Sequence, residues 1–417
     1  MGDEETVGVG IIGLGKRGLN CLGQHIAHLG NEIGLRLTAL CDRKEARMAE
    51  AEALLTGISA GRGKDISPNL YQDGLELIDA PEVDLVLVTS ITDTHRQFAV
   101  PALRSGKKVY CDKPLAQNAE DAIAIVEAEA EANNPLIMGF TRRYEAPWRK
   151  AYALLQEGAI GDLVMVQVRD IIPYHRYLTA WWRRRAWSGG ALNDKGSHLF
   201  DVFNWFAGSR ATKVHGFGGR SMIQPDPGAP PRCRVCDREC PYRRRSSASQ
   251  EVLGLPHAGA SWLQETEEKH TDDVCVYAPG TDLYHNGSIH FEYANGVIAS
   301  YFYTIFGPHA EDQETLELVG TEGRIILTRH TGTLDVVSDH GREHEVVDCR
   351  GEAAGGGSHF GADVELVREL RRFCDGAPPL VSARSGLEAT RMVMASFQSM
   401  DAGGALVWMD EIPDAKR

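Results

Sequence analysis

The sequence lacks any apolar run near the roughly 18 residues that a membrane-spanning helix needs. Its acidic start, Met1-Gly2-Asp3-Glu4-Glu5, lacks the basic and then apolar regions of a signal peptide. It also lacks an excess of positive charge. The formal net charge is −14, whereas nucleic acids and acidic membranes attract basic surfaces. We therefore expect a cytoplasmic protein that binds neither nucleic acid nor a membrane.

No internal repeat is apparent, and 417 residues are too many for one typical domain. In the first third of the chain, apolar runs alternate with helical patterns. This alternation predicts an α/β domain with a parallel sheet and helices on both faces. The predicted strands are 7–12, 35–40, 83–89, 107–110 and 136–140, and the predicted helices are 19–29, 44–55, 97–105 and 119–133.

After about residue 140 the pattern changes to strands with few helices between them, at 163–169, 288–293, 297–305, 314–319 and 324–328. Asn295-Gly296 is a strong hairpin signal, and Glu322-Gly323 plays a similar part in the next pair of strands. We expect a largely antiparallel open sheet, with one face free to pack on helices or on another subunit. Two final helical patterns, 363–375 and 385–402, are expected to pack back on the body.

A glycine-rich motif, Gly13-Leu14-Gly15-Lys16-Arg17-Gly18, follows the first predicted strand and opens a helix. In that context G-x-G-x-x-G predicts a dinucleotide site, because glycines let the backbone approach a pyrophosphate at a helix amino terminus. Asp42 ends the second strand, close to the expected distance of about 20 residues for the carboxylate that binds ribose hydroxyls. This acid favours NAD over NADP, although Arg43 beside it could accept a 2′-phosphate.

Lys113 lies where the strand at 107–110 should end, and a proline follows it. The carboxyl ends of parallel strands border the crevice in which open α/β sheets bind ligands. We therefore expect Lys113 to face the nicotinamide ring of the cofactor.

Several motifs occur in one order along the chain: the glycine loop, Thr94-His95, Gly106-Lys107-Lys108-Val109, Asp112-Lys113-Pro114, Gly139-Phe140-Thr141-Arg142-Arg143-Tyr144, Gly158-Ala159-Ile160-Gly161, and the segment from Gly189 to His198. With these motifs the chain resembles the Gfo/Idh/MocA oxidoreductases, from residue 7 to about 407. Members usually carry Glu-Lys-Pro where this chain has Asp-Lys-Pro.

The resemblance implies a Rossmann domain, here 1–142, followed by an α+β domain with a large, mostly antiparallel open sheet, here 143–417. It also implies NAD(P)-dependent redox chemistry at a hydroxyl carbon of a sugar or cyclitol, in homodimers or homotetramers assembled through that sheet. The expected cofactor-binding residues are Gly13, Leu14, Gly15, Lys16, Arg17, Asp42, Arg43, Thr92, His95, Asp112, Lys113 and Arg143.

Oxidation of a secondary alcohol needs a base and a group that polarises the nascent carbonyl. Asp194 and His198 are four residues apart and would share one face of a helix. We expect His198 to be the base, because an unperturbed imidazole titrates near neutral pH. The family's catalytic lysine, aspartate and histidine map onto Lys113, Asp194 and His198. A metal site that adds Asp201 is an alternative that this chemistry does not need.

Aromatic and cationic residues precede this motif, and they suit an anionic sugar such as a uronate or sulfosugar. The alternative is a solvated loop whose tryptophans pack at a subunit interface. The candidate substrate residues are Tyr174, His175, Arg176, Tyr177, Trp182 and Arg184.

Four cysteines, Cys233, Cys236, Cys240 and Cys275, mark an insertion at about 225–275. They predict a structural zinc held by four thiolates, with an iron–sulfur cluster or unpaired thiols as alternatives. The other five cysteines are expected to be reduced thiols of the core.

The main functional hypothesis is therefore an NAD-dependent sugar or cyclitol dehydrogenase. Some family relatives are NAD-dependent glycosidases, which oxidise a ring hydroxyl transiently, eliminate the aglycone and return the hydride. Such an enzyme needs a further base, for which Tyr174, His175 and Tyr177 are candidates. A non-catalytic sensor that binds NAD and sugar is the third hypothesis, and the presence of all three candidate catalytic residues argues against it.

Overall fold

The structure is a computed structural model that describes residues 6–62, 66–172, 175–179, 181–240, 242, 274–307, 310–352 and 359–415. Its N-terminal part is built on a six-stranded sheet in the order β3-β2-β1-β4-β5-β6, in which every neighbouring pair is parallel. The strands are β1 Val7–Ile12, β2 Leu35–Cys41, β3 Asn69–Tyr71, β4 Leu85–Val88, β5 Lys108–Cys111 and β6 Leu136–Met138.

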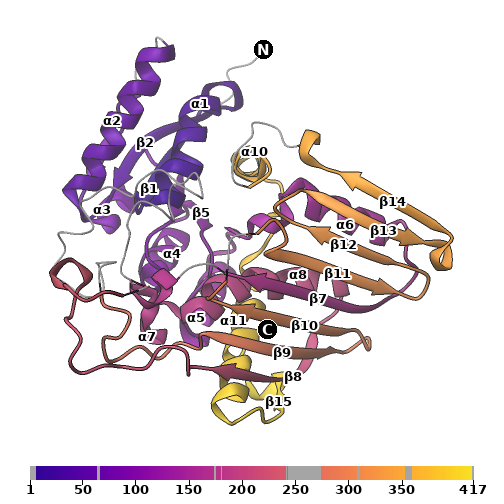
Figure 1. Ribbon diagram of the computed structural model, residues 1–417. Coiled ribbons are helices and arrows are strands. Elements are labelled where there is room, and N and C mark those ends of the chain that lie inside the picture. Colours follow the sequence, from indigo (N-terminus) through magenta and orange to yellow (C-terminus); the bar gives the residue numbers. More distant parts are fainter. Residues whose placement is uncertain are drawn as a thin grey trace.

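The central strands are buried because helices cover both faces of this sheet (Figure 1). These helices are α1 Gln24–Ile33, α2 Glu45–Arg62, α3 Gly74–Asp79, α4 His95–Arg104 and α5 Ala119–Ala132. The predicted parallel α/β fold is confirmed. The sequence patterns missed β3, because it is short, largely exposed at the sheet edge and lacks an apolar run.

The second part is a nine-stranded sheet in the order β14-β13-β12-β11-β7-β10-β9-β8-β15. Its neighbours are antiparallel except β7 and β10, so the expected mostly antiparallel sheet is confirmed. The strands are β7 Leu163–Ile171, β8 Ala211–Gly219, β9 Asn286–Tyr293, β10 Ile298–Thr304, β11 Glu314–Gly320, β12 Arg324–Thr328, β13 Thr333–Ser338, β14 Glu343–Asp348 and β15 Val407–Trp408.

Both predicted hairpins are present. Asn295-Gly296 joins β9 to β10, and Gly296 has a φ of +90°, which favours glycine. Glu322-Gly323 joins β11 to β12.

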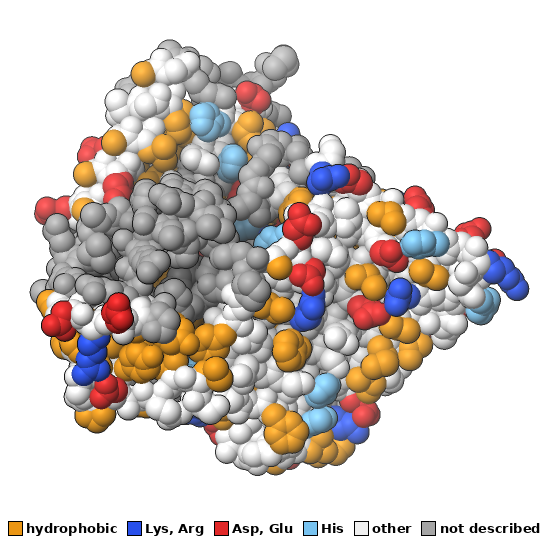
Figure 2. Space-filling model, in the orientation of Figure 1, with side chains coloured by type: hydrophobic (Ala, Val, Ile, Leu, Met, Phe, Trp, Pro, Cys, Tyr) orange, Lys and Arg blue, Asp and Glu red, His pale blue; other side chains and the backbone are white. Residues whose placement is uncertain are grey.

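Helices α6 Ala146–Gln156, α8 Ser197–Ala207 and α11 Ala383–Asp401 pack on one face of the large sheet. The opposite face is open in Figure 2, where apolar, acidic, basic and histidine side chains are mixed. The last two helices return to the N-terminal part: α10 Ala362–Cys374 packs against α1, and α11 packs against α5 and β6 (Figure 1). Within the described ranges, no helix combines the length and the apolar character needed to cross a membrane.

Candidate active site

The glycine loop after β1 packs tightly against the end of β4. A Cβ atom at Gly13, where φ is +96°, would lie 2.6 Å from the backbone of Ser90, and one at Gly18 would lie 2.1 Å from the carbonyl oxygen of Gly13. At Gly15, by contrast, a Cβ would have no described heavy atom within 4 Å. Only glycine therefore fits where the loop meets the sheet, while the loop tip is open. The first turn of the following helix, η1 Lys16–Gly23, suits a pyrophosphate there.

Asp42 follows β2 and fastens this loop. Its Oδ2 accepts a hydrogen bond from the backbone N–H of Leu14 at 2.9 Å, and its Oδ1 accepts one from Lys44 at 2.9 Å. A carboxylate oxygen has two acceptor positions, so both oxygens keep capacity for ribose hydroxyls. Lys16 and Arg43 are exposed near this loop. The loop and Asp42 thus fit a dinucleotide, which would supply the hydride acceptor when bound.

Other predicted cofactor residues bind protein groups in this structure. Both ring nitrogens of buried His95 face backbone carbonyls, of Ser90 at 3.2 Å and Leu115 at 3.3 Å. Arg143 donates two hydrogen bonds of 2.8 Å to the Asp201 carboxylate. Thr92 is buried at the start of the short helix η2 Thr92–Thr94. Contacts of these residues with the cofactor stay predictions.

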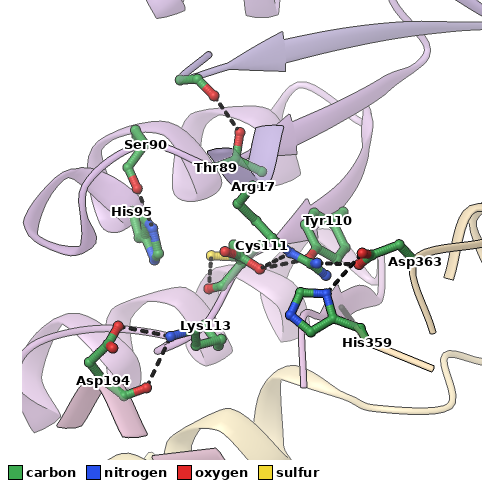
Figure 3. Close-up of polar contacts among 12 residues, drawn as sticks. Arg17, Thr89, Ser90, His95, Tyr110, Cys111, Lys113, Asp194, His359 and Asp363 are labelled. Carbon is green, nitrogen blue, oxygen red and sulfur yellow. Dashed lines mark hydrogen bonds and ion pairs between the residues drawn. The ribbon is translucent and has the colours of Figure 1, made fainter. Parts of the chain in front are cut away.

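Lys113 and Asp194 form the centre of the site. The Lys113 ammonium donates to Asp194 Oδ1 at 2.8 Å and to the Asp194 carbonyl oxygen at 3.0 Å (Figure 3). Lys113 follows β5, and the peptide bond between Lys113 and Pro114 is cis. Asp194 lies in η6 Leu192–Gly196, which leads into α8. Buried Tyr177 donates its hydroxyl to Asp194 Oδ2. The structure therefore joins one residue of the parallel sheet to two residues that precede α8.

The charges of the site keep Asp194 ionised. Burial opposes ionisation, yet the ammonium groups of Lys113 and Lys195 and the donated hydrogen bonds lower the pKa of Asp194 to about 2. Asp194 therefore stays a carboxylate at neutral pH and holds Lys113 in place.

His198 lies one helical turn after Asp194 and is buried, with Phe140 beside it at 5.4 Å between ring centroids. Burial lowers the pKa of the imidazole well below 6.5, and nearby cations, chiefly Lys113, lower it further. The sequence had pointed to an ordinary imidazole pKa. Instead, the ring is neutral throughout the physiological range, which is the form that accepts a proton. Its Nδ1 is buried without a hydrogen-bond partner among the described residues.

The candidate substrate residues divide into two groups. Tyr177 reaches the site through Asp194, and Trp182 packs edge-on against Tyr177 at 5.5 Å between ring centroids. Arg184 lies over the ring of Trp187 at 5.1 Å. Tyr174 lies outside the described residues, as do the side chains of His175 and Arg176, whose backbone belongs to η4 His175–Leu178. Their substrate contacts stay predictions.

A buried ionic network that the sequence analysis missed lies between the two parts of the chain. Arg142 donates to Glu145 at 2.6 Å and to Glu314 at 2.9 Å, and Arg329 donates twice to Glu145 at 2.9 Å. Asp170 on β7 is paired in register with Glu314 on β11. Burial raises the pKa of Asp170, and the negative charge of Glu314 raises it further. The only sequence signal was Arg142 within a family motif, because pairing between distant strands leaves no local pattern.

The predicted zinc site is not supported. Among the described residues, the one group of three or more potential ligand side chains whose ligand atoms all lie within 4.8 Å of one another is Cys21, His359 and Asp363. Cys233, Cys236, Cys240 and Cys275 are described but form no such group. Within one turn of this insertion, Cys236 N–H donates to the carbonyl oxygen of Cys233 at 3.1 Å. The four gathered thiolates that the cysteine spacing predicts are thus not found among the described residues.

Two family models match the chain. Residues 7–140 match an "Oxidoreductase family, NAD-binding Rossmann fold" and residues 148–326 match a "GFO/IDH/MocA C-terminal domain". The two matches follow the order of the two sheets and together cover most of the sequence. The protein belongs to the Gfo/Idh/MocA family of oxidoreductases, as its motifs had indicated.

Curated relatives are similar over part of their length. The Bacillus subtilis protein YteT is 27% identical over 274 residues, which are 62% of this chain and 63% of YteT. Inositol 2-dehydrogenase of Gluconacetobacter diazotrophicus is 35% identical over 206 residues, which are 48% of this chain and 54% of that protein. The matched part of the chain thus spans between half and two thirds of the length of these relatives.

Solved structures resemble the whole chain. A levoglucosan dehydrogenase in complex with NADH and levoglucosan has a TM-score of 0.74 at 17% identity, covering 98% of this chain and 100% of its own. An oxidoreductase domain protein from Kribbella flavida has a TM-score of 0.75 at 19% identity with the same coverage. At these identities the likeness shows a shared fold.

Proposed function

We propose that this protein is an NAD-dependent dehydrogenase that oxidises a secondary hydroxyl of a sugar or cyclitol. The observation that carries the proposal is the Lys113–Asp194 pair with His198 one helical turn further on, at the edge of the parallel sheet that also presents the glycine loop. Curated relatives named inositol 2-dehydrogenase support a polyhydroxylated ring as the substrate. Asp42 supports NAD over NADP, because a carboxylate repels a 2′-phosphate.

The residues divide the work according to their charges. Lys113, held by ionised Asp194, donates a hydrogen bond to the substrate oxygen and stabilises negative charge there. His198, kept neutral, accepts the hydroxyl proton as the C–H hydrogen leaves as hydride. The alcohol thus loses one proton and one hydride and becomes a carbonyl. Tyr177 fixes the second oxygen of Asp194, so that the carboxylate cannot rotate away from Lys113.

The test is incubation of the protein with NAD and a panel of cyclitols, free sugars, uronates and glycosides. Stoichiometric NADH formation with a cyclitol or sugar supports the proposal. Release of an aglycone without net NADH would replace it with the redox-assisted glycosidase. Binding of NAD and sugar without turnover would leave only a sensor.

The same proposal includes a homodimer or homotetramer formed through the open face of the large sheet (Figure 2). Met165 on β7, Phe217 on β8 and Phe302 on β10 are 44%, 64% and 46% exposed on strands of that sheet. Exposed apolar groups among polar ones are typical of interfaces. The charge-introducing substitution Phe302→Asp should lower the molar mass measured by light scattering. An unchanged mass, or a monomeric unmodified protein, would exclude assembly through this face.

A further inference from the structure

Arg17 belongs to the glycine loop, but its side chain binds protein groups on the other side of the loop. Its Nε donates to Asp112 Oδ1 at 3.1 Å, its Nη1 to Asp363 Oδ1 at 2.5 Å and its Nη2 to the Tyr110 hydroxyl at 3.3 Å. Figure 3 shows the guanidinium beside Tyr110 and Asp363. The side chain of Arg17 is 15% exposed, so the contacts lie largely out of water. A guanidinium donates from three separate nitrogens held in one plane, whereas an ammonium donates from a single nitrogen.

Asp112 is the residue before Lys113. Its backbone N–H donates to the Val88 carbonyl oxygen at 2.9 Å, which continues the pairing of β5 with β4. Its side chain is held at Oδ1 by Arg17 and by the Tyr110 hydroxyl at 2.7 Å. Asp112 is buried, and Arg17 is the cation that the structure places on it. Where relatives usually carry the longer glutamate, this chain thus has an aspartate bound by an arginine of the cofactor loop.

Asp363 connects the same guanidinium to the C-terminal part of the chain. It lies in the first turn of α10, and its other oxygen pairs with His359 Nδ1 at 2.9 Å. One arginine therefore links three elements: the cofactor loop, the strand end that carries Lys113, and α10.

We propose that Arg17 is a positioning residue for Lys113: it holds Asp112, the preceding residue, and fastens both to α10 through Asp363. Cys21, His359 and Asp363 lie close enough together to bind one metal ion, but a metal ion fits this place poorly. The guanidinium already donates to Asp363 and supplies the positive charge at that place.

The charge of Arg17 also reaches His198, which gives the proposal a readout that a purely structural residue would not move. Burial and cations from four elements lower the pKa of His198: Lys113 after β5, Arg142 after β6, Lys195 in η6 and Arg17 in η1. Loss of the Arg17 charge leaves Asp112 and Asp363 uncompensated, so the pKa of His198 should rise.

Two substitutions separate position from charge. Arg17→Gln removes both, and should lower kcat by about tenfold to 100-fold while moving the acid limb of the pH profile up by about half a pH unit. Arg17→Lys keeps the charge but loses the three-way geometry, so it should lower kcat with the acid limb unmoved. Arg96→Gln, which removes an exposed arginine of α4 paired with Asp121 of α5, is the matched control and should behave as the unmodified protein. Thermal unfolding of each variant checks that it is folded.

The proposal rests on the proposed function for its kinetic readout only. Titration of His198 by histidine NMR in the cofactor-free protein, with the signal assigned by its loss in His198→Gln, needs no substrate. If no sugar or cyclitol is turned over, the proposed function fails. A higher titration midpoint of His198 in Arg17→Gln, but not in Arg17→Lys, still supports the link from Arg17 to the site. Unchanged kcat in both folded variants, or an unmoved midpoint in Arg17→Gln, overturns the proposal.

Discussion

The ammonium nitrogen of Lys113 lies 2.8 Å from Oδ1 of Asp194, although 81 positions separate the two residues in the chain. Lys113 follows strand β5 of the parallel sheet, whereas Asp194 precedes a helix that covers the mostly antiparallel sheet. This ion pair is therefore a direct contact between the cofactor-binding part of the molecule and the part that is expected to hold the substrate.

Replacement of Lys113 by Ala should abolish hydride transfer while NAD still binds. The expected loss in kcat is about 100-fold to 10,000-fold, the usual contribution of a positioned proton donor or acceptor. Steady-state NADH formation measures kcat, and calorimetric titration measures NAD binding. Turnover at the unmodified rate would remove Lys113 from the site, and loss of NAD binding would assign it to the cofactor instead.

Replacement of Tyr177 by Phe should lower kcat by about fivefold to 30-fold, because it deletes a charge-assisted hydrogen bond to Asp194. The ring stays, so the packing against Trp182 is kept. Tyr303→Phe is the control, because it also removes a buried tyrosine hydroxyl, one whose partner is the carbonyl oxygen of Tyr284 at 3.5 Å and not Asp194. Equal kinetics for the two variants would show that Tyr177 only packs.

Replacement of Asp42 by Ala should raise the KM for NAD about tenfold or more and reduce the preference for NAD over NADP. The substitution removes the proposed ribose acceptor and the hydrogen bonds to the Leu14 and Lys44 backbone. Asp42→Asn keeps one acceptor oxygen without the charge, and serves as the comparison. Parallel titrations with both cofactors decide the matter, and an unchanged cofactor ratio in both variants contradicts the role of the charge.

Asp170 should make stability depend on pH. Its folded-state pKa is raised above the ordinary value of 3.8, so the folded protein holds this proton more tightly than the unfolded chain does. The resulting stabilisation is complete at pH values below 3.8 and is lost as the pH rises through the folded-state pKa.

Asp170→Asn removes this titration and keeps an acceptor for the Tyr301 hydroxyl. At pH values above neutral, the Tm of this variant should be about 2 °C higher than that of the unmodified protein. In acid, the two Tm values should become equal. Asp162→Asn, at an exposed position just before β7, is the control for calorimetric scans across pH. A Tm difference that does not vary with pH would show that the Asp170 carboxyl is not the group responsible.

Local patterns predicted most of the parallel domain. Continuous apolar runs such as Leu85–Val88 leave no choice of exposed face, and the glycine loop has steric requirements that the sequence meets by itself. The hairpin at Asn295-Gly296 was equally local, because a left-handed turn residue between two strands determines their pairing.

Patterns were less informative where partners are distant. The cysteine spacing predicted a zinc site that the described residues do not form, because spacing constrains which thiolates could meet but not whether the loop brings them together. The pKa of His198 was likewise misjudged, since it depends on burial and on cations from separate elements.

The sequence by itself determined the family and the two sheets, and it pointed to Lys113, Asp194 and His198 as candidate catalytic residues, because each of the three belongs to a motif of a few adjacent residues. Only the tertiary structure decided what those groups can do. Segments far apart in the chain approach each other and keep Asp194 charged and His198 neutral. The same close approach lets Arg17 donate hydrogen bonds to Asp112 and Asp363. Charge and burial act through space, so no local pattern can report them.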